Sequence, residues 1–312
     1  MELRSLVDVE LREALAPINR AARGEFLPAL RTAAQLRERA SWGLLDLKLS
    51  RACVIGGSVA AACLVEHLAD ERVAHIEALA ADPLAQQRGA LRALVEAVLG
   101  AAKSAGVAEL SVLAADMDSA QVGALQAAGF VRRQLVGRYT LSGAPASRPL
   151  PVERHTGEPP PAGQPWLETL SVMEGQAILS SLGAAMGTFS SRRSVLARLA
   201  GRLMAVACFQ PAASDSPRPV AIVIGDRERK LVCALAGETE ALTSLLCFAA
   251  ARFGLAHVEA LAEEDGAAGA LLAAGYSRTA VRVEMVCDPQ QVTFPQRATQ
   301  AAAAAPGVKG GE

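Results

Sequence analysis

Residues 73–99 of this chain, VAHIEALAADPLAQQRGALRALVEAVL, decide the fold of its first half. The run VAHIEALA is mostly apolar and predicts a strand, which ends before the turn signal at Pro83. From Gly89 to Ser104, apolar residues recur three and four positions apart and predict an amphipathic helix. The polar segment at residues 86–88 is expected to form a loop between the strand and the helix.

The start of that helix is a candidate anion-binding site. The first N–H groups of a helix have no partner within it and carry partial positive charge, which suits a phosphate or pyrophosphate. Gln86, Gln87 and Arg88 add donors, and glycine at position 89 lets the backbone approach an anion closely. The alternative is an ordinary strand-loop-helix connection with a solvated polar loop, and these residues alone leave both open.

Charge and composition narrow the class of protein. The 312 residues carry 31 Lys+Arg against 32 Asp+Glu, for a formal charge of -1. Binding to the phosphates of nucleic acid needs a basic surplus, so no nucleic acid is expected as a partner. Hydrophobic residues make up 51% of the chain and charged residues 20%, enough for a core in each of two domains.

Cysteine and histidine usage predicts neither a metal site nor an oxidising compartment. The six cysteines form no C-x-x-C pair, and the four histidines show no metal-ligand spacing. The N-terminus is charged from its second residue, unlike a secretion signal. No apolar run approaches the roughly 20 residues that a membrane span needs. We therefore expect a protein of the reducing cytoplasm without a membrane partner.

The chain divides into two blocks. Residues 143–165 are rich in proline and glycine and lack an apolar period, which predicts a linker. From residue 288 onward the composition predicts a flexible tail. The remaining blocks, 1–142 and 166–287, are the expected domains.

The two blocks share a repeat. ALQAAGF at residues 124–130 recurs as ALLAAGY at residues 270–276. Gly89 and Gly106 are 17 residues apart, and Gly237 and Gly254 have the same separation. Each block then runs in the same order: helix, glycine, apolar strand, acidic turn, short helix and final strand. A hairpin is expected in each block as well, so the sheets should be mixed and not purely parallel.

The segment at residues 77–91, EALAADPLAQQRGAL, is followed by a strand ELSVLAADMD and a helix that ends in AAGF. This order resembles the GNAT superfamily of N-acetyltransferases, in which an acidic or polar strand residue precedes V-x-P, a short loop and Q/R-x-x-G-x-G/A. The resemblance implies an α/β fold of two tandem GNAT-like domains, each with a mixed, largely antiparallel sheet flanked by helices. It covers nearly all of the first block and, more faintly, the second.

The resemblance also implies acetyl-CoA as co-substrate and transfer of its acetyl (acyl) group to a primary amine. The amine would attack directly in a ternary complex, and it would belong to a small molecule or a peptide. The residues expected to bind acetyl-CoA are Leu79, Ala80, Ala81, Gln86, Gln87, Arg88, Gly89, Ala90 and Leu91.

Three residues depart from the family pattern. Leu91 stands where the family prefers glycine or alanine, and we expect its side chain to crowd the pyrophosphate position. Ala81 replaces a valine whose main chain contacts the pantetheine arm in the family. Leu125 stands where many members have a tyrosine that protonates the departing thiolate. A thiolate with a pKa near 8.5 is already a good leaving group, so this loss is tolerable.

Two residues of the predicted strand are candidates for the catalytic base. An amine is mostly protonated at neutral pH and needs a base before it can attack. Strand periodicity places His75, Glu77, Leu79 and Ala81 on one face. Glu77 stands where relatives often have their base, with a solvated or ion-paired strand residue as the equal alternative. His75 is the second candidate, although a structural histidine is favoured at this position.

The second block lacks the polar loop. CALAG at residues 233–237 passes straight into a helix, with Glu238 and Glu240 in its first turn. Carboxylates there stabilise the helix but repel a pyrophosphate. This half is therefore expected to bind no CoA and to act as a degenerate repeat. The run DRERK at residues 226–230 is interpreted as a hairpin turn.

Two other functions stay open at this stage. A non-catalytic protein that binds acyl-CoA, or merely keeps the fold, agrees with Leu91 and Leu125, because fold does not guarantee activity. Alternatively, the repeat is coincidental and the chain holds unrelated α/β domains. The identity of the acceptor does not follow from the residues, and an oligomer is compatible with all three readings.

Overall fold

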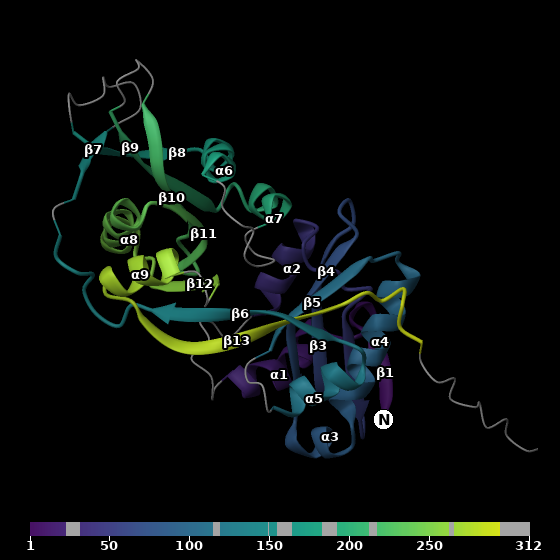
Figure 1. The fold of residues 1–312 in the computed structure, drawn as a ribbon. Helices are drawn as coiled ribbons and strands as arrows, with labels where there is room; N and C mark the ends of the chain where they lie inside the picture. The colour runs from purple at the N-terminus through teal and green to yellow at the C-terminus, as the bar shows by residue number, and fades with distance from the viewer. Residues whose placement is uncertain are drawn as a thin grey trace, which may run out of the picture.

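The strands of the protein form one continuous sheet. The computed structural model describes residues 1–22, 32–114, 119–148, 150–154, 164–182, 192–211, 217–261 and 265–293. Within these residues the sheet has thirteen strands in the order β1-β2-β3-β4-β5-β13-β6-β12-β11-β10-β9-β8-β7. Helices pack on its faces in both halves of the molecule (Figure 1). The predicted mixed α/β fold is confirmed.

The first half follows the predicted order of elements. Its elements are β1 Glu2–Ser5, α1 Leu11–Ala22, α2 Ala33–Ser41, β2 Arg51–Ile55, β3 Ser58–Leu68, β4 Val73–Ala81, α3 Pro83–Gln87, α4 Ala90–Ser104, β5 Glu109–Ala114, α5 Ala120–Ala127 and β6 Val131–Thr140. The β2–β3 hairpin turns at Gly56 and Gly57, with φ of 60° and 82°, a left-handed conformation that glycine adopts without strain. Helix α1 covers one face of this part of the sheet, and α4 and α5 cover the other.

The second half repeats this order. Its elements are β7 Val152–Arg154, β8 Trp166–Leu170, α6 Val172–Ser181, α7 Arg193–Arg198, β9 Leu203–Gln210, β10 Arg218–Asp226, β11 Leu231–Gly237, α8 Thr239–Phe253, β12 His257–Leu261, α9 Asp265–Ala273 and β13 Ser277–Cys287. Helices α4 and α8 both have 15 residues. Each is followed by a left-handed glycine, Gly106 at φ 74° and Gly254 at φ 70°. The repeat seen in the sequence is therefore a repeat of structure.

The two halves exchange their last strands. Strand β13, from the second half, lies between β5 and β6 of the first half and is antiparallel to both. Strand β6, from the first half, lies between β13 and β12. The two long strands cross the middle of the molecule together (Figure 1). Sequence blocks 1–142 and 166–287 therefore do not form separate sheets, because each supplies a strand to the other.

The predicted linker contains a short strand. Residues 152–154 form β7, which pairs in parallel with β8 at the edge of the sheet. Residues 288–293 continue from β13, while the rest of the predicted tail, from residue 294, lies outside the described residues. Among the described helices, none has the length and apolar character that crossing a membrane requires.

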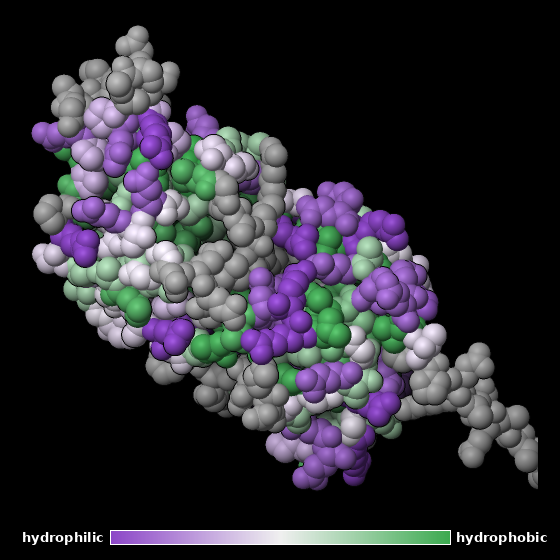
Figure 2. All heavy atoms as spheres, viewed as in Figure 1, coloured by the Kyte–Doolittle hydropathy of each residue, from purple (hydrophilic) through white to green (hydrophobic). Residues whose placement is uncertain are grey.

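Polar and apolar contacts join the two halves. Leu44 and Leu68 of the first half are fully buried in a core cluster of the second half. Arg198 pairs with Asp70 at 2.8 Å, and the Arg202 guanidinium lies 4.8 Å from the Trp42 ring centroid. On the face drawn in Figure 2, hydrophilic and hydrophobic side chains are interspersed over both lobes. The halves are thus joined by shared strands, a shared core and charged pairs.

Candidate active site

The site begins where β4 and β5 part. These parallel strands are in register from Val73 opposite Glu109 to Ile76 opposite Val112. Within the described residues, β5 pairs with none of residues 77–81, so the main chain of β4 has an edge without a strand partner there. A strand edge of this kind can hydrogen-bond an extended ligand.

A β-bulge lies at the point of parting. Ile76 is opposite Val65 on β3, but the next matched residue is Ala78, opposite Leu64. Glu77 is therefore the extra residue, and an extra residue changes which face the following side chains occupy. Leu79 and Ala81 pack with Ile76 in the core beside α4. The expectation that His75, Glu77, Leu79 and Ala81 share one face is therefore wrong.

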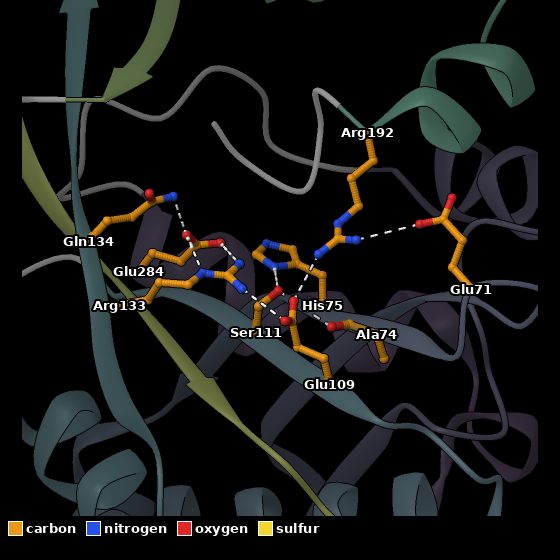
Figure 3. A network of polar contacts seen from close by, with 9 residues as sticks. All are labelled: Glu71, Ala74, His75, Glu109, Ser111, Arg133, Gln134, Arg192 and Glu284. Atoms are coloured by element: carbon orange, nitrogen blue, oxygen red, sulfur yellow. Dashed lines mark hydrogen bonds and ion pairs between the residues drawn. The ribbon is translucent and has the colours of Figure 1, made fainter. Parts of the chain in front are cut away.

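His75 lies in a buried polar layer. Its side chain is 5% exposed, and its Nδ1 lies 2.9 Å from the Oγ of Ser111 on the neighbouring strand. Figure 3 shows this pair beside an ion network in which Glu109 accepts hydrogen bonds from Arg133 and Arg192. These contacts favour the structural interpretation of His75.

The same network reaches the second half. Glu284 on β13 is fully buried and accepts hydrogen bonds from Nε and Nη2 of Arg133 at 3.1 and 2.8 Å. Arg192, directly before α7, donates to Glu109 at 2.8 Å. The second half therefore supplies charged side chains to the layer that contains His75 (Figure 3). Sequence patterns gave no sign of this layer, because its members come from four strands and a helix start.

Glu77 is partly buried between charged groups. Its side chain is 17% exposed, and Nη2 of Arg229 lies 3.7 Å from its Oε1. Burial alone would lower the pKa of Arg39, but the nearby carboxylates of Glu66 and Glu77 raise it above its ordinary value. Glu77 is therefore an ion-paired residue, as one of the two sequence interpretations held. An ion pair does not exclude a catalytic role.

The segment after β4 contains a short helix, not only a loop. Gln86 and Gln87 belong to α3, which the structure places where the sequence predicted a loop. Pro83 starts this helix, because its fixed φ suits the first helical position. The side-chain amide of Gln86 donates to the carbonyl of Ala81 at 3.1 Å. This bond ties α3 to the end of β4.

Gly89 begins α4 in a left-handed conformation. Its φ is 76°, and α4 has no side-chain cap at its first turn. The residues from Gln86 to Gly89 are exposed, and a Cβ at Gly89 would meet no atom within 4 Å. The start of α4 therefore faces open space with its first N–H groups uncapped, as an anion site requires.

Leu91 and Leu125, two of the three residues that depart from the family pattern, point into the core. Leu91 is 6% exposed and packs among the apolar residues under α4, so its side chain does not crowd the anion position. The expectation of crowding is wrong, because the helix turns this side chain toward the sheet. Ala90 is likewise buried, with 0% of the whole residue exposed, main chain included. Leu125 is fully buried in the same core.

A cavity lies beside the segment that joins β4 to α4. It has a volume of about 670 Å³ and lies between α1, the β2–β3 hairpin and α3. Arg20 of α1 holds Asp82 through two hydrogen bonds of 2.9 Å at its wall. Arg88 also lines the cavity. The Arg20–Asp82 ion pair fixes the end of β4 relative to α1.

The second half has no such segment. Strand β11 ends at Gly237, and α8 begins at Thr239 with Glu238 as its cap residue. A Cβ at Gly237, where φ is 140°, would overlap the carbonyl oxygen of Val220. Gly237 pairs with Ala221 of β10, so the neighbouring strand would obstruct a side chain at this position. The direct passage from strand to helix and the acidic first turn are as predicted, and the absence of CoA binding stays a prediction.

Comparison with known proteins supports the resemblance to the GNAT superfamily. Residues 15–130 match the model of the acetyltransferase (GNAT) family. No curated protein matches the sequence of the chain.

Solved structures are similar over almost the whole chain. A tandem GNAT protein from the clavulanic acid biosynthesis pathway is 17% identical, with a TM-score of 0.57 over 92% of this chain and 99% of its own. A GCN5-related N-acetyltransferase from Sphaerobacter thermophilus is 15% identical, with a TM-score of 0.59 over 94% and 96%. The protein thus has a tandem GNAT fold, and its resemblance to the GNAT superfamily is confirmed.

Proposed function

We propose that the first half transfers an acetyl group from acetyl-CoA to a primary amine. The observation that carries this proposal is the parting of β4 from β5 after Ile76, together with the exposed, uncapped start of α4 at Gly89. An extended arm with a diphosphate at one end matches both features. The unpaired strand edge suits the amides of the arm, and the helix start suits the anion.

Residues of the segment have separate roles in this proposal. The main chain of Leu79, Ala80 and Ala81 contacts the pantetheine arm. The start of α4 at Gly89 receives the diphosphate, and the exposed side chains of Gln86, Gln87 and Arg88 surround it. The bond from Gln86 to Ala81 holds these two parts of the site together.

Glu77 is the proposed base. The acceptor amine must lose a proton, and a carboxylate can take it through a water molecule while the amine attacks the thioester carbon. The carbon–nitrogen bond forms, the carbon–sulfur bond breaks, and the thiolate leaves. Glu77 lies in the bulge at the point of parting, which supports this role. His75, tied to Ser111, is the second candidate.

Direct attack agrees with the state of the cysteines. All six are free and buried. Cys63 lies opposite Leu79 on β3, and burial raises the pKa of its thiol to about 12. Such a thiol is protonated at neutral pH and is a poor nucleophile. This supports a ternary complex over an acetylated cysteine.

The test combines binding with turnover. Acetyl-CoA at a hundredfold excess over Kd should stabilise the folded protein by about 2.7 kcal/mol in a thermal-shift assay. An amine library, followed by release of the CoA thiol, should identify an acceptor. Glu77→Gln should then lower turnover by about 10² to 10⁴ while leaving acetyl-CoA affinity nearly unchanged.

A non-catalytic acyl-CoA-binding protein is the second candidate. The fully buried Leu125, in place of the tyrosine that the family uses as an acid, favours it. The same assay separates the two functions. Stabilisation by acetyl-CoA without turnover across the library supports the binding protein, and no stabilisation contradicts both.

A further inference from the structure

We infer that Arg229, from the second half of the chain, is a positioning residue for the carboxylate of Glu77 at the active site of the first half. This inference rests on the proposed function, because it assigns to the degenerate repeat a part in the chemistry of the other repeat. Arg229 lies in the turn between β10 and β11, and its Nη2 is 3.7 Å from Oε1 of Glu77.

The turn that carries Arg229 is itself held in place. Asp226, at the end of β10, is 2% exposed, and its Oδ1 accepts the backbone N–H of Arg229 at 3.0 Å. Arg227 of the same turn stacks over Phe253 with 4.4 Å between the guanidinium carbon and the ring centroid. Glu228 pairs with Arg202. Each neighbour in the turn therefore has a structural partner, and Arg229 is the member that extends to β4.

Charged groups of both signs face Glu77. Arg39 of α2 pairs with Glu66 of β3, which is 3% exposed, and its charge also interacts with Glu77 and Asp226. Acidic and basic side chains therefore alternate across the interface, in the order Glu66, Arg39, Glu77 and Arg229. A bulge residue is not fixed by regular strand pairing, and these two cations contribute to the position of the Glu77 carboxylate.

The consequence for catalysis is geometric and electrostatic. A base must lie within hydrogen-bond reach of the proton it takes, directly or through one water. Arg229 holds the carboxylate at the parting of β4 and β5 and keeps it ionised, since a cation within about 4–6 Å favours the charged form. It does so from the half that is predicted to bind no CoA. This gives the second repeat a function that does not depend on a second active site.

The experiment compares three variants of the full chain. Arg229→Met removes the charge, Arg229→Lys keeps it, and Arg198→Ala removes a different contact between the halves, the ion pair with Asp70 at 2.8 Å. Carbon-detected NMR titration of the Glu77 carboxyl should show a higher pKa in Arg229→Met than in the native chain, because a neighbouring cation is lost. Arg229→Lys should restore most of this difference, and Arg198→Ala should leave the titration unchanged.

Kinetics with an identified acceptor give the second readout. In Arg229→Met we expect the acidic limb of the pH profile of kcat/KM to move to higher pH, with kcat roughly ten- to a hundredfold lower and KM for acetyl-CoA unchanged. Arg198→Ala should keep the native profile, which separates the positioning effect of Arg229 from a general loosening of the interface.

The outcomes distinguish this inference from the proposed function. Unchanged titration and an unchanged pH profile in Arg229→Met, in an active native protein, overturn the inference and leave the acetyltransferase standing. A shifted titration of Glu77 in Arg229→Met, together with a native protein that acetylates no amine, supports the contact between Arg229 and Glu77. It contradicts both the catalytic role of that contact and the proposed function.

Discussion

The two halves differ most in the few residues between one strand and one helix. In the first half, residues 82–89 separate β4 from α4 and include α3 and a left-handed glycine. In the second half, Glu238 alone separates β11 from α8. The helices that follow have the same length. The difference teaches that one framework can carry two unlike connections between the same strand and helix.

The two connections also differ in their glycines and in their charge. A Cβ at Gly237 would overlap the main chain of β10, the strand with which it pairs, whereas a Cβ at Gly89 would meet no atom. Glu238, paired with Arg218 at 3.1 Å, and Glu240 place carboxylates at the start of α8, while the first turn of α4 has no acidic residue. The acidic first turn is favourable for the helix and unfavourable for a diphosphate. Three independent features thus distinguish the two connections.

The largest expected effect concerns the independence of the halves. A chain that ends at residue 142 keeps β1 to β6 but loses β13, which separates β5 from β6. Without β13, Glu284 no longer pairs with Arg133, and the β5 and β6 edges are exposed. We expect no cooperative thermal unfolding of this fragment by circular dichroism. A sharp transition with native-like acetyl-CoA binding would show that the exchanged strand is dispensable.

The next effect is the number of CoA sites. Titration calorimetry of the full chain with acetyl-CoA should give one site per chain, because α8 starts with the carboxylates of Glu238 and Glu240 and lacks the polar segment that precedes α4. Glu240→Gln, which removes one of these carboxylates, should leave this stoichiometry unchanged, since that segment still has no counterpart. A stoichiometry of two would contradict the asymmetry.

The smallest expected effect isolates the glycine at the helix start. Gly89→Ala and Gly254→Ala each place a side chain at a left-handed residue, with φ of 76° and 70° and no atom nearby. Both should lower the unfolding free energy by about 1 kcal/mol. Gly89→Ala alone should weaken acetyl-CoA binding, by about fivefold, a loss near 1 kcal/mol. Equal affinities in the two variants, measured by calorimetry, would remove Gly89 from the site.

Local patterns were sufficient for most of the elements. The hairpin at Gly56-Gly57, the helix after Gly89 and the turn at residues 226–230 are all present, because each depends on neighbours in sequence. The short helix at Pro83 was missed, since five residues are too few for an apolar period. The bulge at Glu77 was also missed, because a strand pattern alone does not reveal a register shift made with its partner.

Contacts between distant residues account for the rest of the candidate site. Leu91 faces the core because of how α4 packs on the sheet, and the family pattern alone pointed the other way. Arg229 was identified only as part of a turn, since nothing in DRERK shows that β4 lies opposite. A signal was nevertheless present: a charged turn beside a buried strand needs partners for its charges.

The sequence by itself determined the order of elements, the repeat and the asymmetry of the two connections, since hydrophobic period, glycine and proline act over a few residues. Only the tertiary structure decided that the last strands exchange, that a bulge turns Glu77 out of the strand pattern, and that Arg229 reaches it from the other half. The strand exchange and the contact of Arg229 arise from pairing and packing between segments more than a hundred residues apart, and the bulge arises from the pairing of β4 with β3. No local pattern encodes that pairing.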